Sequence, residues 1–181
     1  AYPDVSLSLD LSDRLVDLTD ERYDCAIRIG DLTDSRIIGA RLADNRRVVV
    51  ATPAYLARHG TPDTPDDLAR HNCLSFDGQG NQSRGWLFRV KGGVRPLRVK
   101  GNLACSDGSI LHEWTLAGCG LSWRSLWEVQ DDIASGRLVT VLDAYAAPPN
   151  GIFAMTAERK HLPLRVRYFI AFLKQRYSGF P

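Results

Sequence analysis

The 181 residues are enough to bury a hydrophobic core, either in one domain or in two small lobes. Hydrophobic residues make up 44% and charged residues 24%, a balance that excludes a disordered or collagen-like chain. With 23 Lys and Arg against 21 Asp and Glu, the formal charge of +2 does not by itself predict a phosphate-binding surface, so nucleic acid contact is not expected for this chain.

Positions 5–11 alternate between apolar and polar side chains, which is the period of a strand with one buried face. Ser12 and Asp13 can cap a short helix up to Leu18, and residues 25–29 then complete a β-α-β unit. The elements predicted next are strands at 37–42 and 46–52 with a turn at Asp44 and Asn45 between them, helices at 55–59 and 65–70, and a strand at 73–76.

The Gly, Gln, Asn and Ser residues of 77–85 predict an exposed loop, and Gly92 and Gly93 predict a hairpin between strands at 86–90 and 94–99. Elements expected beyond the hairpin are a helix from Ser106 to Gly118, a strand at 121–123, a helix at 126–134, a strand at 138–142, a linker at 147–151 and a strand at 152–156. The last helix carries Val166, Phe169, Ile170 and Leu173 on one stripe.

Alternating strands and helices predict an α/β fold of mostly parallel sheets flanked by helices, and the loop and linker divide it into two lobes.

The four cysteines, Cys25, Cys73, Cys105 and Cys119, show neither CxxC pairs nor Cys/His metal spacing, and we expect them to be buried and reduced. No cofactor or metal site is predicted, because the chain carries no Gly-rich phosphate loop, HExxH motif or acidic cluster.

The histidines lie at helix ends or on helical faces, with His112 expected on a helix surface, and have no serine or cysteine partner in the sequence. We therefore predict no catalytic residues and no enzyme activity.

The pairs Arg46 with Arg47 and Arg165 with Arg167 have acidic or apolar neighbours, which favours solvated faces. The N-terminal residues lack the basic and apolar parts of a signal peptide. No apolar run approaches the roughly 20 residues that cross a bilayer. A cytoplasmic protein without membrane contact is expected.

Three ordered motifs resemble the effector-binding domain of LysR-type transcriptional regulators. Residues 23–30, YDCAIRIG, are similar to the family signature fDvAIRiG, residues 46–60 to RRVLVASPAYLARHG, and residues 65–71 to PeDLarH. Later segments agree at 106–108, 117–121, 135–139 and 164–173, so that the resemblance covers essentially the whole chain. Cys119 and the triplet Trp123-Arg124-Ser125 depart from the family pattern beside the expected pocket, which leaves the ligand open.

This resemblance implies a two-lobe fold like that of type II periplasmic binding proteins, joined by two crossover strands. Lobe one would comprise 1–51 and 152–181, lobe two 52–151, with Thr52 and Phe153 at the crossings. The family's winged helix-turn-helix, linker helix and first strand and helix of lobe one would lie upstream of Ala1. Without that strand and helix, we expect lobe one to expose unpaired backbone and apolar surface.

In such folds a ligand lies beyond the carboxyl ends of strands and between lobes. A helix start at Ser106 favours an anionic group, although Asp107 can equally cap the helix. Trp123 can face a ring or belong to the core, and Arg28 can meet a ligand or face outward. The candidate ligand-binding residues are Arg28, Ile29, Gly30, Asp31, Thr52, Pro53, Ser106, Asp107, Gly108, Ser122, Trp123 and Phe153.

The resemblance implies an effector-sensing domain that binds a small anionic or aromatic molecule and forms a homodimer or tetramer. In the dimer, the helix near 13–18 of one chain would meet the helix near 109–116 of the other. DNA would be bound only through the upstream winged helix-turn-helix. The alternatives are a periplasmic solute-binding protein of a transporter and a small dehydratase-like enzyme on the same fold.

Overall fold

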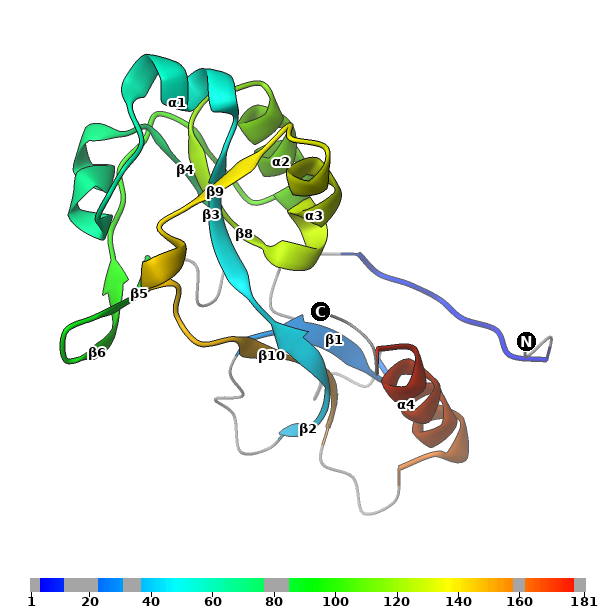
Figure 1. The fold of residues 1–181 in the computed structure, drawn as a ribbon. Helices are drawn as coiled ribbons and strands as arrows, with labels where there is room; N and C mark the ends of the chain where they lie inside the picture. Colours follow the sequence, from blue (N-terminus) through cyan, green and yellow to red (C-terminus); the bar gives the residue numbers. More distant parts are fainter. Residues whose placement is uncertain (1–3, 12–22, 31–36, 77–84, 158–161, 178–181) are drawn as a thin grey trace.

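The computed structural model describes residues 4–11, 23–30, 37–76, 85–157 and 162–177, which form two main sheets (Figure 1). A three-stranded sheet has the order β1-β10-β2, and a five-stranded sheet has the order β7-β4-β8-β3-β9. The strands are β1 (Ala26–Ile29), β2 (Ile37–Asn45), β3 (Arg47–Ala51), β4 (Cys73–Phe76), β7 (Ala104–Cys105), β8 (Leu121–Ser125), β9 (Val139–Val141) and β10 (Asn150–Ala157).

The helices and a separate hairpin complete the fold. The helices are α1 (Pro53–His59), α2 (Gly108–Leu116), α3 (Leu126–Ala134) and α4 (Leu164–Tyr177), with 3-10 helices η1 (Pro65–Arg70) and η3 (Asp143–Tyr145). The hairpin pairs β5 (Trp86–Val90) with β6 (Gly93–Leu97). The predicted α/β class and the two-sheet architecture are thus present.

The expectation of mostly parallel sheets is wrong in detail. Strand β4 pairs in parallel with β7 and β8, but β3 pairs antiparallel with β8 and β9, and both pairings of β10 are antiparallel. The physical reason is the long strand at 37–51, which crosses from one sheet to the other and enters each beside strands that run the opposite way.

The predicted turn at Asp44 and Asn45 is also wrong. Strand β2 continues through Asn45, and Arg46 alone separates it from β3. Asn45 is fully buried and is held by side-chain hydrogen bonds, which overrides its preference for turns. The chain therefore passes between the sheets at Arg46 and returns between β9 and β10.

Alternation along β3 divides the core of the five-stranded sheet into two layers. Val49 and Ala51 face a cluster with Tyr55, Leu68, Trp86 and Phe88, whereas Val48 and Val50 face Val129 and Leu138. Helices α2 and α3 thus lie on one face, and α1, η1 and the hairpin lie on the other (Figure 1). The smaller sheet packs Leu42, Ile152 and Ala154 against Ile170 and Leu173 of α4.

The segment at 4–11 does not form the predicted strand. It runs away from both sheets in Figure 1, and Val5, Leu7, Leu9 and Leu11 are all exposed. No described strand lies beside it, so the alternation has no sheet to bury its apolar face against. The helix predicted at 12–18 lies outside the described residues.

Within the described residues, no helix is long and apolar enough to cross a membrane.

Candidate functional site

The first group of predicted ligand residues lies on the three-stranded sheet. Arg28 of β1 is paired with Phe153 of β10, and Ile29 is paired with Ile152. The Gly30 N–H donates to the Gly151 carbonyl over 2.9 Å, which joins the end of β1 to the start of β10. Asp31 lies outside the described residues.

Phe153 lies inside β10 rather than at a crossing. Its ring lies over Gly151, since a Cβ built on that glycine would come within 2.2 Å of the ring. The Arg41 guanidinium lies 5.8 Å from the ring centroid on the neighbouring strand. A glycine at 151 is therefore what allows the aromatic ring to cover this stretch of backbone.

Thr52 and Pro53 start α1 at the end of β3. The Thr52 side chain accepts a hydrogen bond from the Tyr55 N–H and caps the helix, and Pro53 occupies the first helical position. Thr52 is buried, whereas Pro53 is exposed. These residues have a clear local structural role, and their ligand role stays a prediction.

Ser106, Asp107 and Gly108 form the start of α2, where the cap is already made. One Asp107 carboxylate oxygen accepts from the N–H groups of Ser109 and Ile110, at 2.7 and 3.0 Å. These are donors that the anion expected at this helix start would have used. Of the two sequence alternatives, the structure therefore places the capping role on Asp107 and leaves Ser106 exposed.

Ser122 and Trp123 point to opposite faces of the five-stranded sheet. Ser122 is fully buried, and its hydroxyl lies 2.8 Å from the Thr115 hydroxyl of α2 in a hydrogen bond. Trp123 belongs to the core on the other face, where the Arg47 guanidinium lies 4.3 Å from a ring centroid. Because neighbouring strand residues alternate in direction, the two side chains do not converge on one ligand.

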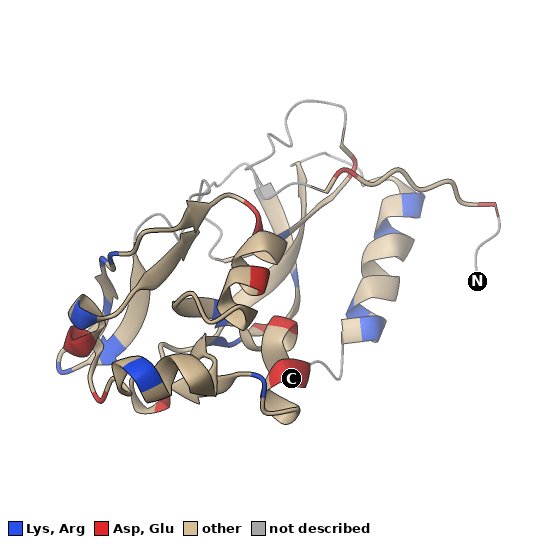
Figure 2. Ribbon diagram, turned by 90° about the horizontal axis from the view of Figure 1, so that it is seen from above, with Lys and Arg blue, Asp and Glu red and all other residues tan. Residues whose placement is uncertain are grey.

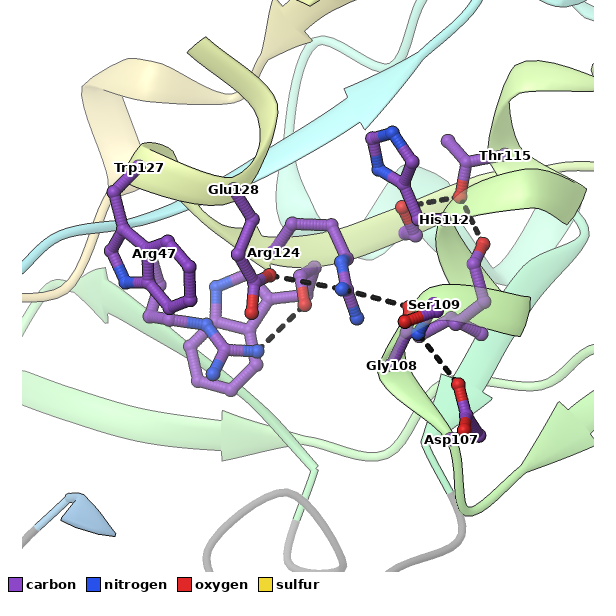
Figure 3. A network of polar contacts seen from close by, with 12 residues as sticks. Arg47, Asp107, Gly108, Ser109, His112, Thr115, Arg124, Trp127 and Glu128 are labelled. Atoms are coloured by element: carbon purple, nitrogen blue, oxygen red, sulfur yellow. Dashed lines mark hydrogen bonds and ion pairs between the residues drawn. The ribbon is translucent and has the colours of Figure 1, made fainter. Parts of the chain in front are cut away.

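Arg124 ties the start of α2 to the start of α3. Its guanidinium donates to the Gly108 carbonyl over 2.9 Å and lies 3.0 Å from the Glu128 carboxylate (Figure 3). A Cβ on Gly108 would come within 3.3 Å of this guanidinium, so the small residue permits the close approach. The Arg124 side chain is 6% exposed, and its Nε has no hydrogen-bond partner among the described residues.

Arg47 adds a second cation to this cluster. The Arg47 guanidinium donates to the Trp123 carbonyl over 2.7 Å. The residue as a whole is half-buried, but its Nε atom is fully enclosed. Burial lowers the pKa of Arg47 to about 10, with Glu128 opposing that change and Arg124 adding to it. Arg47 therefore stays charged at neutral pH, and the expectation that Arg46 and Arg47 form a solvated face is wrong for Arg47.

The name arginine cluster is used here for Arg47, Arg124 and Glu128, because Glu128 pairs with Arg124 and both charges act on the pKa of Arg47. Reasoning from the sequence missed all three as functional candidates. The available signal was the triplet at 123–125, where an arginine stands inside a segment that is apolar in the resembling family.

The described residues contain an open groove elsewhere, between α4 and strands β2 and β10. It encloses about 300 Å³, and none of the predicted ligand residues lines it. Apolar side chains dominate the lining, with Arg167 and Lys174 on the helix side. The arginine cluster carries the polar groups that orient a charged ligand, so it is the stronger candidate site.

Among the described residues, no group of His, Cys, Asp and Glu is arranged to hold a metal ion. The four cysteines carry free thiols, but only Cys73 is buried, and the other three are half-buried. The prediction of four buried thiols is therefore wrong for Cys25, Cys105 and Cys119.

The model of the LysR substrate binding domain matches residues 1–178. The chain is 39% identical over 178 residues to the HTH-type transcriptional regulator DmlR of Escherichia coli (strain K12), covering 98% of this chain and 58% of that regulator. It is 35% identical over 179 residues to the regulator CrgA of Neisseria meningitidis serogroup C, covering 98% of this chain and 59% of that protein. The chain thus spans less than two thirds of these relatives.

Solved structures give the same result. The CrgA regulatory domain from Neisseria meningitidis superposes with a TM-score of 0.76 at 34% identity, covering 88% of this chain and 78% of that chain. Full-length AphB of Vibrio cholerae superposes with a TM-score of 0.79, covering 97% of this chain and 59% of that chain, and at 24% identity it shows the fold alone.

Proposed function

The chain belongs to the LysR substrate-binding domain family, and from this premise we propose that it senses a small carboxylate-bearing effector bound at the arginine cluster. It is the effector-binding domain of a LysR-type regulator and not an enzyme, because its relatives are transcriptional regulators. Neither a transporter's solute-binding protein nor a dehydratase is favoured. The nature of the effector is our inference, and it rests on one observation, the enclosed Arg124 Nε–H, which has no hydrogen-bond partner among the described residues.

An enclosed donor on a cation favours an anion. Arg124 pairs with Glu128, but its Nε has no hydrogen-bond partner among the described residues. An enclosed donor without an acceptor is unfavourable, and a carboxylate that accepts from it recovers that free energy. The Arg124 Nε–H is an enclosed donor that such a carboxylate can satisfy.

The aromatic alternative has less support. Arg47 already lies over the Trp123 ring on the face where a ring-shaped ligand would stack. We therefore infer an acidic effector, with Trp123 holding Arg47 in place.

Effector binding can act on a regulator only if it favours one arrangement of the protein over another. Arg124 joins the starts of α2 and α3, so an anion that draws its guanidinium from the Gly108 carbonyl would shift one helix start relative to the other. We retain the division into lobes as a proposal, with the boundary moved to Arg46, where the chain changes sheet. Homodimer or tetramer formation, and DNA binding through an upstream winged helix-turn-helix, are proposed for the whole regulator.

The test compares two substitutions with opposite expected effects. Arg124→Gln removes the enclosed cation and should weaken carboxylate binding by about 10-fold to 100-fold, as expected for loss of a charged hydrogen bond. Glu128→Gln removes the competing carboxylate with little change of shape and should tighten the same binding. Calorimetric titration with acetate, malonate, succinate and benzoate measures both.

Arg70→Gln is the matched control, because Arg70 is exposed and pairs with Asp67 on η1. It should leave carboxylate affinity unchanged. A failure of all four acids to bind, or equal affinity in the Arg124→Gln and Glu128→Gln variants, would contradict the proposal.

A further inference from the structure

The β5–β6 hairpin packs on the same face of the five-stranded sheet as α1 and η1. Trp86 and Phe88 are 4% and 3% exposed and belong to the cluster with Tyr55 and Trp123. Phe88 also forms a backbone bridge with Ala146 after η3. Two buried aromatic anchors therefore fix the base of the hairpin, which protrudes at the lower left of Figure 1.

The outer part of the hairpin and the segment after it are basic. The cations are all exposed, and none takes part in the ion pairs found between described residues; they are Arg89, Lys91, Arg95, Arg98 and Lys100. The sequence has no Asp or Glu from Gly78 to Ser106. This is defined here as the basic hairpin, and its side of the molecule carries blue segments in Figure 2.

Strand pairing places these cations on both faces of the hairpin. Arg89 lies opposite Val94, and Phe88 lies opposite Arg95, so that Arg89 and Arg95 point to different faces. Lys91 stands at the turn, where Gly92 and Gly93 have positive φ angles of 94° and 122°. The tip is thus surrounded by positive charge and fits a partner whose negative charges are spread along a surface.

We propose that the basic hairpin contacts the phosphate backbone of duplex DNA in the assembled regulator, a contact additional to the family's helix-turn-helix. The proposal rests on the proposed function, which places this domain in a DNA-bound protein. Lys and Arg recognise phosphate directly, and unpaired surface cations are free to do so. The hairpin exposes no aromatic side chain on which bases of a single strand could stack, because Trp86 and Phe88 are buried.

Such contact is independent of base sequence and should depend strongly on salt. The 181-residue chain is titrated against a fluorescein-labelled duplex of about 30 base pairs, by anisotropy, between about 20 and 200 mM salt. The variant Arg89→Gln/Arg95→Gln/Arg98→Gln should make the negative slope of log affinity against log salt less steep by about 2.7, since each phosphate contact contributes about 0.9.

The matched control, Arg165→Gln/Arg167→Gln/Lys174→Gln, removes the same charge from α4 and should change the slope by much less. The proposal is overturned if both triple variants change the slope equally, or if the unsubstituted chain does not bind the duplex at the lowest salt. It is also overturned if the hairpin variant loses binding only to phosphatidylserine vesicles or to polyglutamate. Carboxylate titration of the hairpin variant separates the two proposals, because the arginine cluster is intact there.

Discussion

His71 lies at the end of η1 in a buried contact with the Tyr55 hydroxyl. The Asn72 N–H donates to the Tyr55 hydroxyl over 3.0 Å, and that hydroxyl lies 3.4 Å from His71 Nδ1. The phenol oxygen accepts from Asn72, and its own proton can be donated to Nδ1 when His71 is neutral. Burial, followed by the nearby His59 and Arg70, lowers the pKa of His71.

We expect the free energy of unfolding to fall on acidification because of His71. Its pKa in the folded chain is lower than the value of about 6.5 in the unfolded chain, so the unfolded chain binds more protons below that pH. The contribution is present above about pH 6.5 and is lost as pH falls through the folded pKa. Urea denaturation at a series of pH values measures this dependence.

His71→Gln should flatten the dependence, whereas His59→Gln should retain most of it, because burial and not His59 is the larger cause. An equal pH dependence of the free energy of unfolding in the unsubstituted chain and in His71→Gln would contradict the role assigned to His71.

Residue roles of this kind were the hardest to predict from sequence. His112, expected on a helix surface, lies 2.9 Å from the Asp132 carboxylate, which is almost fully buried and also pairs with Arg137. The sequence separations between these partners carry no periodic signal, because the contact joins two different helices. For Trp123 the sequence left core packing and a ligand contact both open, and the structure buries its side chain in the core.

At the scale of single elements, the start of α2 depends on one carboxylate. Asp107 satisfies two N–H groups of the first turn, and Ser106 beside it is exposed. Arg124 also stabilises this end by donating to the Gly108 carbonyl.

Asp107→Ala should lower the free energy of unfolding by about 0.5–2 kcal/mol, the usual loss of an N-cap. Ser106→Ala is the neighbouring control and should change it by less than about 0.5 kcal/mol, as for an ordinary surface substitution. Thermal unfolding followed by circular dichroism measures both. A larger loss in Ser106→Ala than in Asp107→Ala would mean that the cap is assigned to the wrong residue.

Elements were predictable where local pattern and local burial agree. Helix α4 forms at 164–177 with Val166 buried and Ile170 packed on the sheet, as its stripe predicts. In α2 the buried residues are Leu111 and Thr115, while the apolar Ile110 is 45% exposed. The hydroxyl of Thr115 is buried because it bonds to Leu111 and Ser122, an arrangement that hydrophobic periodicity does not register.

At the scale of the whole molecule, one buried asparagine joins two strands of the three-stranded sheet to helix α3, which packs on the five-stranded sheet. The Asn45 amide donates to the Asn150 side chain over 2.8 Å, and its oxygen accepts from the Trp127 indole over 3.1 Å. These residues belong to β2, β10 and α3. Next to them, the Arg46 carbonyl accepts from the Leu126 N–H over 2.8 Å.

Asn45→Ala should lower the free energy of unfolding by about 1–3 kcal/mol, because it leaves the polar groups of Asn150 and Trp127 without this partner. Asn102→Ala is the matched control, since Asn102 is exposed and bonds to Asn72. Urea denaturation compares the two variants. An equal, small effect in both would show that the contact between the three-stranded sheet and α3 does not depend on Asn45.

The overall architecture could be predicted because the motifs resemble a family whose fold is common to all its members. The place where the chain changes sheet could not be predicted, because asparagine is a residue type typical of turns and Asn45 is nevertheless fully buried. The arginine cluster was hidden for a similar reason, since Arg47 and Arg124 come from strands that become neighbours only in the sheet.

Strands β2 and β3 are separated by Arg46 alone, so this connection between the two sheets is short and stiff. At this connection, a rotation of one sheet relative to the other changes the backbone dihedral angles of Arg46. The Arg46 carbonyl accepts from the Leu126 N–H at the start of α3, so the same rotation would move this end of the helix. A displacement of α3 is therefore coupled to the backbone conformation of one residue, Arg46.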